Sequence, residues 1–178
     1  MSDLIQVERD DSIATVVFNR PKMRNAISLA MWAEIASVTN ELAMDEAVRA
    51  IVYRGAGRQA FASGADISEF QENRKDIATA LAYNKTTEAA YNAIRLCPKP
   101  TVAMVFGFCM GGAMAVAMAC DFRFAAEGSK FGIPAAPLLT TSALPRGVTN
   151  SCITGRQVCV QANRSMPAAA SSACARSG

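Results

Sequence analysis

The sequence contains no histidine among its 178 residues. This absence excludes Ser-His and Cys-His catalysis and removes the side chain that most often binds a metal. Six cysteines are present, but no two of them form a C-x-x-C pair or a zinc-binding spacing. We therefore expect no metal site, and we interpret the cysteines as small core or incidental residues of a protein in a reducing, cytoplasmic setting.

Acidic residues are missing from the C-terminal part of the chain. Residues 137–178 contain four arginines and no acid, whereas residues 1–136 contain 14 basic and all 15 acidic residues, a net charge of −1. The basic tail lacks the aromatic side chains that stack on bases, which argues against nucleic-acid binding. It also lacks a sustained helical or strand period, so we expect it to be largely irregular or disordered.

One long uncharged run, Thr101–Cys120, dominates what the sequence does contain. About 20 apolar residues can span a bilayer, so a membrane helix is one interpretation. Three glycines interrupt the run, however, and each would cost a helix about 1 kcal/mol relative to alanine. We therefore prefer a buried strand over Thr101–Phe106, a turn over Gly107–Gly111 and a buried helix over Gly112–Cys120. The polar N-terminus does not resemble a signal peptide, and we expect no membrane partner.

Hydrophobic patterns predict alternating strands and helices in the N-terminal third. Leu4–Glu8 and Ile13–Phe18 are strand-like and flank an Asp-Asp-Ser turn, which predicts a hairpin. Ser28 is a suitable N-cap for a helix that runs to about Glu46. Its predicted buried side chains recur at helical spacing: Trp32, Ile35, Thr39 and Leu42. A buried strand over Val48–Tyr53 follows, and this succession predicts an α/β layer fold.

The next segments give weaker signals. The segment Gly55–Ala60 fits G-x-G-x-x-A, but a second turn rather than a long helix follows it, so we reject a dinucleotide site. A capping-box pattern at Ser68 predicts a helix to about Leu96, with a break near Tyr83–Lys85. Beyond the apolar run we expect a short strand over Asp121–Ala125 and a loop over Lys130–Pro134.

Two glycine-containing turns follow apolar strands, at Ser63–Asp66 and Gly107–Gly112. Each offers backbone N–H groups at the end of a sheet. If the two strands are neighbours, one N–H from each turn converges on a single oxygen and forms an oxyanion hole without side chains. The alternative is that both are only tight turns, and spacing alone does not decide between them.

Several motifs, in order along the chain, resemble the crotonase family of enoyl-CoA hydratases and isomerases. The matching segments are Asn19–Ala26, Phe61–Ile67, Lys99–Ala103, Gly107–Gly112, Cys120–Asp121 and Phe131–Pro134. The resemblance covers residues 1–136 and implies an α/β crotonase-like spiral of β-β-α repeats, truncated at its C-terminal end by the non-family tail 137–178. It implies an acyl-CoA substrate, no cofactor beyond the CoA of that substrate, and the family's trimers or hexamers, whose assembly the foreign tail would weaken.

The resemblance also implies site residues. The backbone N–H groups of Ala65 and Gly112 would grip the thioester oxygen and stabilise an enolate. The loop around 24–26 and the turn 62–67 would hold the CoA portion, with Arg24 either meeting a phosphate or exposed to solvent. The implied substrate-binding residues are Arg24, Ala26, Ala62, Gly64, Ala65, Asp66, Ile67, Phe108, Gly111 and Gly112.

The chain departs from the family at two catalytic positions. The glutamates that family hydratases use fall on Ala115 and Ala135, and general acid–base groups of this kind contribute roughly 10²–10⁴-fold. Asp66, Glu69 and Glu72 are the carboxylates that remain nearby in the sequence. Two functions stay open. One is an acyl-CoA enzyme that performs isomerisation, decarboxylation or thioester hydrolysis, and the other is a catalytically inactive remnant that binds acyl-CoA weakly or not at all.

Overall fold

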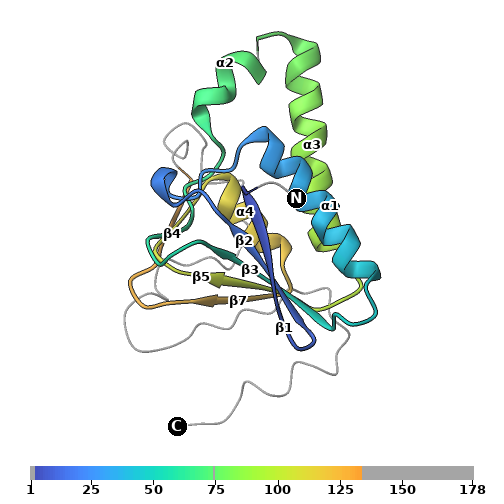
Figure 1. Ribbon diagram of the computed structural model, residues 1–178. Helices are drawn as coiled ribbons and strands as arrows, with labels where there is room; N and C mark the ends of the chain where they lie inside the picture. The colour runs from blue at the N-terminus through green and yellow to red at the C-terminus, as the bar shows by residue number, and fades with distance from the viewer. Residues whose placement is uncertain (1–2, 74, 134–178) are drawn as a thin grey trace, which may run out of the picture.

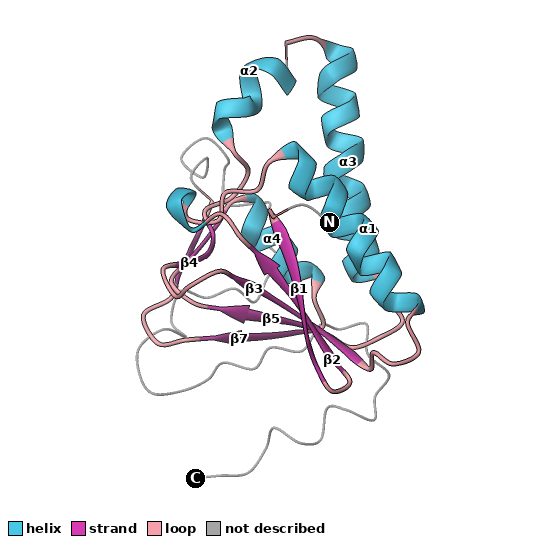
Figure 2. Ribbon diagram, in the orientation of Figure 1, coloured by secondary structure: helices cyan, strands magenta, loops and turns pink. Residues whose placement is uncertain are grey.

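The computed structural model describes residues 3–73 and 75–133. Figure 1 shows the strands fanned out at one end of the molecule and the long helices stacked beside and beyond them. Figure 2 shows the same separation by element type, with helices gathered on one side of the main sheet. The core therefore lies between a helical layer and a sheet, as expected for an α/β protein.

The chain begins with the predicted hairpin. Strands β1 (Ile5–Asp10) and β2 (Ile13–Phe18) pair antiparallel, with Ile5 opposite Phe18 and Asp10 opposite Ile13. Asp11 in the turn has φ 52°, a left-handed conformation that aspartate tolerates better than most residues. The hairpin prediction is confirmed.

Helix α1 (Leu29–Met44) begins at the predicted cap, where the Ser28 side chain accepts a hydrogen bond from the Met31 N–H at 3.3 Å. All four side chains predicted for its inner face are buried. Strand β3 (Ala50–Gly55) then pairs parallel to β2. It begins two residues later than predicted because the Val48 N–H closes a turn on the Asp45 carbonyl, at 3.0 Å.

The predicted helix after Ser68 is broken at a different place. A short 3₁₀ turn (Ile67–Glu69) leads into α2 (Phe70–Asn73), and α3 (Ile77–Arg95) is continuous through residues 83–85, where we expected the break. The true capping box is that of Asp76, whose carboxylate accepts from the Thr79 N–H at 2.7 Å. The Ser68 hydroxyl instead donates to Asp66. Aspartate and serine are comparable N-caps, so the local pattern did not distinguish the two sites.

The long apolar run folds as strand, strand and helix. Strand β5 (Thr101–Val105) and helix α4 (Gly112–Ala119) match the prediction. The segment between them is not only a turn, because it contains β6 (Phe108–Met110). No helix in the described ranges is long and apolar enough to cross a membrane, and the membrane-helix interpretation is dropped.

A second small sheet explains two of these differences. Strand β4 (Ala60–Ala62), β6 and β8 (Lys130–Gly132) pair parallel in the order β4-β6-β8. The predicted loop over Lys130–Pro134 is therefore partly a strand. Strands of three residues carry no readable period, and they form only when the fold brings their partners together.

The larger sheet has the order β1-β2-β3-β5-β7, where β7 (Phe122–Ala125) is the predicted strand after the apolar run. Its helix-facing side chains join those of α1, α3 and α4 in one cluster. The largest fully buried side chains are Trp32, Tyr53, Phe18 and Phe61.

Candidate active site

The turn after β4 and the start of α4 lie against each other. A methyl carbon built on Gly64 would lie 3.7 Å from the Gly112 nitrogen and 2.9 Å from the Met110 carbonyl oxygen. Gly64 also has φ +106°, which side-chain-bearing residues rarely adopt. The sheet neighbours β4 and β6 thus bring the two predicted turns together, because parallel strands end on the same side of a sheet.

The two predicted oxyanion donors are held in place while their own protons stay available. The peptide groups around Ala65 bond to Ile27, through Ile27 N–H to Gly64 O at 2.8 Å and Asp66 N–H to Ile27 O at 2.9 Å. The Gly111 N–H donates to the Gly132 carbonyl at 2.8 Å. Within residues 3–73 and 75–133, neither the Ala65 N–H nor the Gly112 N–H has an acceptor. Gly112 is the first residue of α4, so its N–H lies at the positive end of the helix.

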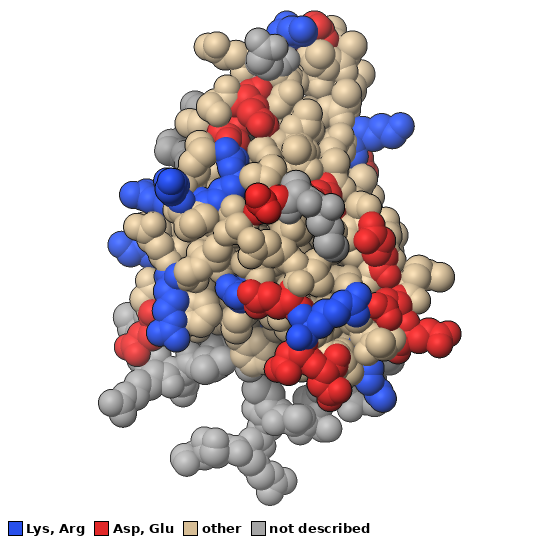
Figure 3. Space-filling view, in the orientation of Figure 1, with Lys and Arg blue, Asp and Glu red and all other residues tan. Residues whose placement is uncertain are grey.

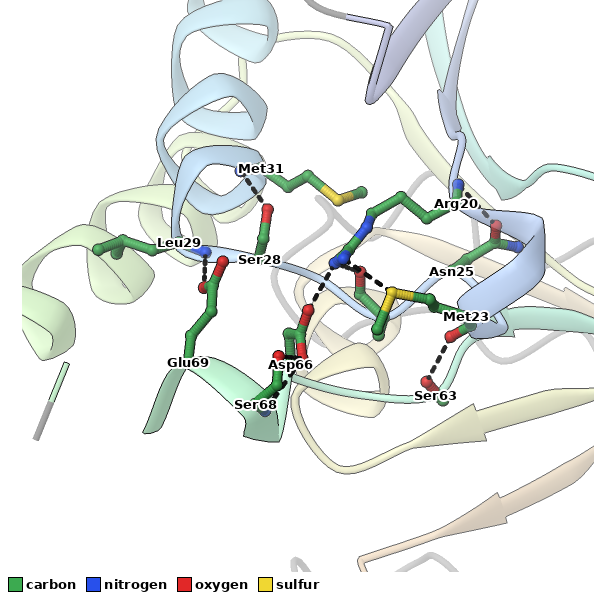
Figure 4. Close-up of polar contacts among 11 residues, drawn as sticks. Arg20, Met23, Asn25, Ser28, Leu29, Met31, Ser63, Asp66, Ser68 and Glu69 are labelled. Carbon is green, nitrogen blue, oxygen red and sulfur yellow. Dashed lines mark hydrogen bonds and ion pairs between the residues drawn. The ribbon is translucent and has the colours of Figure 1, made fainter. Parts of the chain in front are cut away.

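A polar network ties the loop before α1 to the turn after β4 (Figure 4). The Arg20 guanidinium donates to Asp66 Oδ2 at 2.8 Å and to the Ala26 carbonyl at 2.9 Å. The buried Asn25 side chain accepts from the Arg20 N–H at 3.1 Å and donates to the Ala60 carbonyl at 2.8 Å. The two segments that the resemblance assigns to CoA binding are therefore fixed to each other.

Asp66 is an anchor of this network. Its side chain is 5% exposed and also accepts from the Ser68 hydroxyl at 2.7 Å. The Ser68 hydrogen bond, with a further contribution from Arg20, holds the pKa of Asp66 below its ordinary value, although partial burial works in the opposite direction. A carboxylate that stays ionised and engaged is poorly suited to transfer protons near neutral pH.

The other two candidate carboxylates, Glu69 and Glu72, do not provide a free acid or base in the described part of the structure. The Glu69 carboxylate accepts from the Leu29 N–H at 2.7 Å and caps α1 (Figure 4). The side chain of Glu72 and all of Ala135 lie outside the described part of the structure. Ala115 is exposed on α4, one turn after Gly112. Among the described side chains, these positions therefore offer no free carboxylate to act in place of the glutamates that the resemblance predicts to be absent.

Cations gather around an aromatic ring near the same loop. The Arg24 guanidinium carbon lies 5.4 Å from the Phe108 ring centroid, and the Lys130 ammonium lies 5.5 Å from it. Basic side chains also stand out on the left edge of Figure 3, while acidic ones concentrate at the lower right. We call Arg24, Phe108 and Lys130 the cation–ring cluster. Its two cations attract an anionic group such as a phosphate.

The remaining predicted site residues occupy different environments. Ala26 and Ala62 are buried, at 7% and 0% exposed. Ile67 is 76% exposed immediately after the turn. Sequence reasoning missed Trp32 and Tyr91 as neighbours of Gly112, and no sequence signal marked them because they come from two other helices.

An α/β fold of this topology is the crotonase fold. The chain belongs to the enoyl-CoA hydratase/isomerase family, whose model matches residues 8–170. The match extends beyond residue 136, the predicted limit of the resemblance. Residues 134–178 lie outside the described residues, so the predicted boundary and the predicted irregular tail remain predictions.

Similar proteins support this assignment. The chain is 34% identical over 128 residues to the short-chain-enoyl-CoA hydratase of Clostridium acetobutylicum, covering 72% of this chain and 48% of that protein. It is 31% identical to the human mitochondrial Delta(3,5)-Delta(2,4)-dienoyl-CoA isomerase, covering 78% of this chain and 46% of that one. The crystal structure of an enoyl-CoA hydratase/carnithine racemase from Magnetospirillum magneticum matches with 39% identity and a TM-score of 0.74, over 82% of this chain and 54% of that chain. The chain spans about half the length of the curated relatives it matches.

Proposed function

We propose that this chain binds an acyl-CoA thioester and polarises its carbonyl oxygen with the N–H groups of Ala65 and Gly112. The observation that carries the proposal is the close approach of the two turns, together with the absence of a described acceptor for either N–H. Removing one oxyanion donor of this kind costs about 3–4 kcal/mol of transition-state stabilisation. The dipole of α4 adds to the same favourable field.

The CoA portion of the substrate lies, in this proposal, along the loop at 24–26 and the turn at 62–67. The cation–ring cluster supports it, because Arg24 and Lys130 offer positive charge to a CoA phosphate. The exposed side chain of Ile67 offers an apolar contact. Asp66 contributes by holding the turn through Arg20 rather than by touching the ligand.

The reaction that best fits these residues passes through a thioester enolate without two glutamates. Alanine at 115 and 135 argues against ordinary hydration of a 2-enoyl thioester. Isomerisation and decarboxylation remain, since each passes through that enolate, and thioester hydrolysis remains because its tetrahedral oxyanion would use the same hole. We further propose a cytoplasmic setting and an assembly weaker than the family's trimers or hexamers.

A second candidate is an inactive remnant that binds acyl-CoA weakly or not at all. The alanines at positions 115 and 135 favour it, because neither can transfer a proton. The intact pair of turns favours the first candidate. The two differ in whether the purified chain binds an acyl-CoA.

The test is a titration of the purified chain with crotonyl-CoA, followed by an assay for loss of its enoyl absorbance. Ala65→Pro removes the proposed donor N–H, whereas Ala65→Gly keeps it. We expect the proline variant to lose binding or turnover, and the glycine variant to retain both. Unchanged behaviour of a folded Ala65→Pro protein would refute the placement of the oxyanion hole. No binding by the wild-type chain would favour the remnant.

A further inference from the structure

The first residue of α4 packs against two aromatic side chains. A methyl carbon built on Gly112 would lie 3.2 Å from Trp32 Cζ2 and 3.4 Å from the Tyr91 hydroxyl oxygen. The two rings meet edge to face, with centroids 5.2 Å apart and planes at 68°. The Tyr91 hydroxyl thus lies beside the residue that carries the proposed oxyanion donor.

Both rings bring a hydrogen-bond donor that lacks an acceptor among the described residues. Trp32 is 1% exposed, and its Nε1 atom has no partner there. The Tyr91 hydroxyl also has none within residues 3–73 and 75–133. A buried donor without an acceptor destabilises the folded protein, and native proteins rarely leave one. Of the two donors only Trp32 Nε1 is buried, whereas Tyr91 is part-buried, so its hydroxyl stays accessible to a ligand that lies beside Gly112.

The environment keeps the Tyr91 hydroxyl in its protonated form. Burial raises the pKa of Tyr91 to about 12, with a smaller contribution from Tyr83. At neutral pH the group is therefore a proton donor and not a base. One helical turn after Gly112, Ala115 provides no carboxylate that competes for this role.

We propose that the Tyr91 hydroxyl delivers a proton to the α-carbon of the thioester enolate. This inference rests on the proposed function. In this proposal the substrate lies next to Gly112, and the N–H groups of Ala65 and Gly112 bind its thioester oxygen. The α-carbon is two bonds from that oxygen. The electron pair of the enolate forms a C–H bond with the Tyr91 proton while the carbonyl double bond re-forms. The resulting tyrosinate then takes a proton from water and releases hydroxide, which restores the site.

The experiment follows the reverse of this step, the exchange of α-hydrogens of butyryl-CoA in D₂O, by NMR. Wild-type protein should catalyse the exchange, with a rate that rises with pH because it needs the small tyrosinate fraction. Tyr91→Phe should slow it by roughly 10²–10⁴-fold, the usual contribution of a general acid or base. Tyr53→Phe, which removes a buried tyrosine hydroxyl from β3 that bonds to Thr39, is the matched control and should exchange at the wild-type rate.

Binding is followed separately through Trp32, the single tryptophan of the sequence. Because its ring adjoins Gly112 and Tyr91, butyryl-CoA should change its fluorescence, and Tyr91→Phe should bind within a few-fold of wild type. Equal exchange by Tyr91→Phe and wild type, or no exchange by a wild-type protein that binds, overturns this inference alone. If calorimetry shows that butyryl-CoA saturates the wild-type protein while Trp32 fluorescence does not change, the Tyr91 inference is also overturned. This comparison needs no variant. A wild-type protein that binds no acyl-CoA overturns the proposed function and this inference together.

Discussion

Arg20 and Asp66 form an ion pair at 2.8 Å although 46 residues separate them in the sequence. Their side chains are 19% and 5% exposed, so the pair is largely buried. It joins the loop before α1 to the glycine turn that carries Ala65. The position of one proposed oxyanion donor therefore depends on a contact between side chains that do not themselves face the oxygen.

Replacement of Arg20 by methionine should destabilise the fold strongly. The change keeps much of the side-chain volume but leaves Asp66 buried without its cation, and breaking such a pair costs about 3 kcal/mol or more. Chemical denaturation measures the loss. Arg9→Met is the control, because the Arg9–Asp45 pair is much more exposed, at 53% and 31%, and surface pairs contribute little. Equal losses in the two variants would contradict the buried role of Arg20.

Asp66→Asn should change how stability depends on pH. The pKa of Asp66 is lower in the folded protein than in the unfolded chain, where it is about 3.9. The unfolded state therefore binds more protons as the pH falls. The stabilisation is present above about pH 4 and is lost as the pH falls through the folded-state pKa. When the pH is lowered from 7 to 3, the free energy of unfolding should thus fall less steeply in Asp66→Asn than in wild type.

Two other acids with lowered pKa, Asp45 and Asp76, remain in both proteins of that comparison. The difference between the two pH profiles therefore isolates Asp66. Parallel profiles would show that Ser68 and Arg20 do not favour its ionised form.

Gly64→Ala should be more damaging than Gly57→Ala. Both glycines have positive φ, +106° and +72°, and a left-handed alanine costs about 1–2 kcal/mol. At Gly64 the new methyl group also meets the Met110 carbonyl at 2.9 Å, whereas at Gly57 nothing lies within 4 Å. Thermal or chemical denaturation should show an extra loss of about 1–3 kcal/mol at Gly64. Acyl-CoA binding should weaken only in that variant, and equal effects would argue against tight contact between the two turns.

Glu69→Ala should weaken the start of α1. The lost hydrogen bond to the Leu29 N–H leaves a helix N-terminal donor unpaired, which costs about 1 kcal/mol. Glu46→Ala is the control, since Glu46 is exposed in the turn after the helix and should change stability little. Denaturation curves compare the two, and a Glu69→Ala protein as stable as wild type would show that the cap contributes nothing.

Local signals predicted the elements with long, regular patterns. The hairpin, α1 with its Ser28 cap, and the strand and helix of the apolar run follow from period and capping chemistry, which involve neighbouring residues. The same reasoning misplaced the break between α2 and α3, because Asp76 and Ser68 are comparable caps by sequence. It missed β4, β6 and β8 because three residues are too few to show an alternation.

The sequence by itself determined the family and the order of the motifs, and it predicted that the family's two glutamates fall on alanines, since each of these depends only on which residue stands where. The tertiary structure alone decided that the turns at Gly64 and Gly112 touch, that Arg20 neutralises Asp66, and that Trp32 and Tyr91 meet at the start of α4. These contacts join distant segments, and their geometry depends on how helices pack on two sheets. Residue spacing along a chain does not encode that packing in any local pattern.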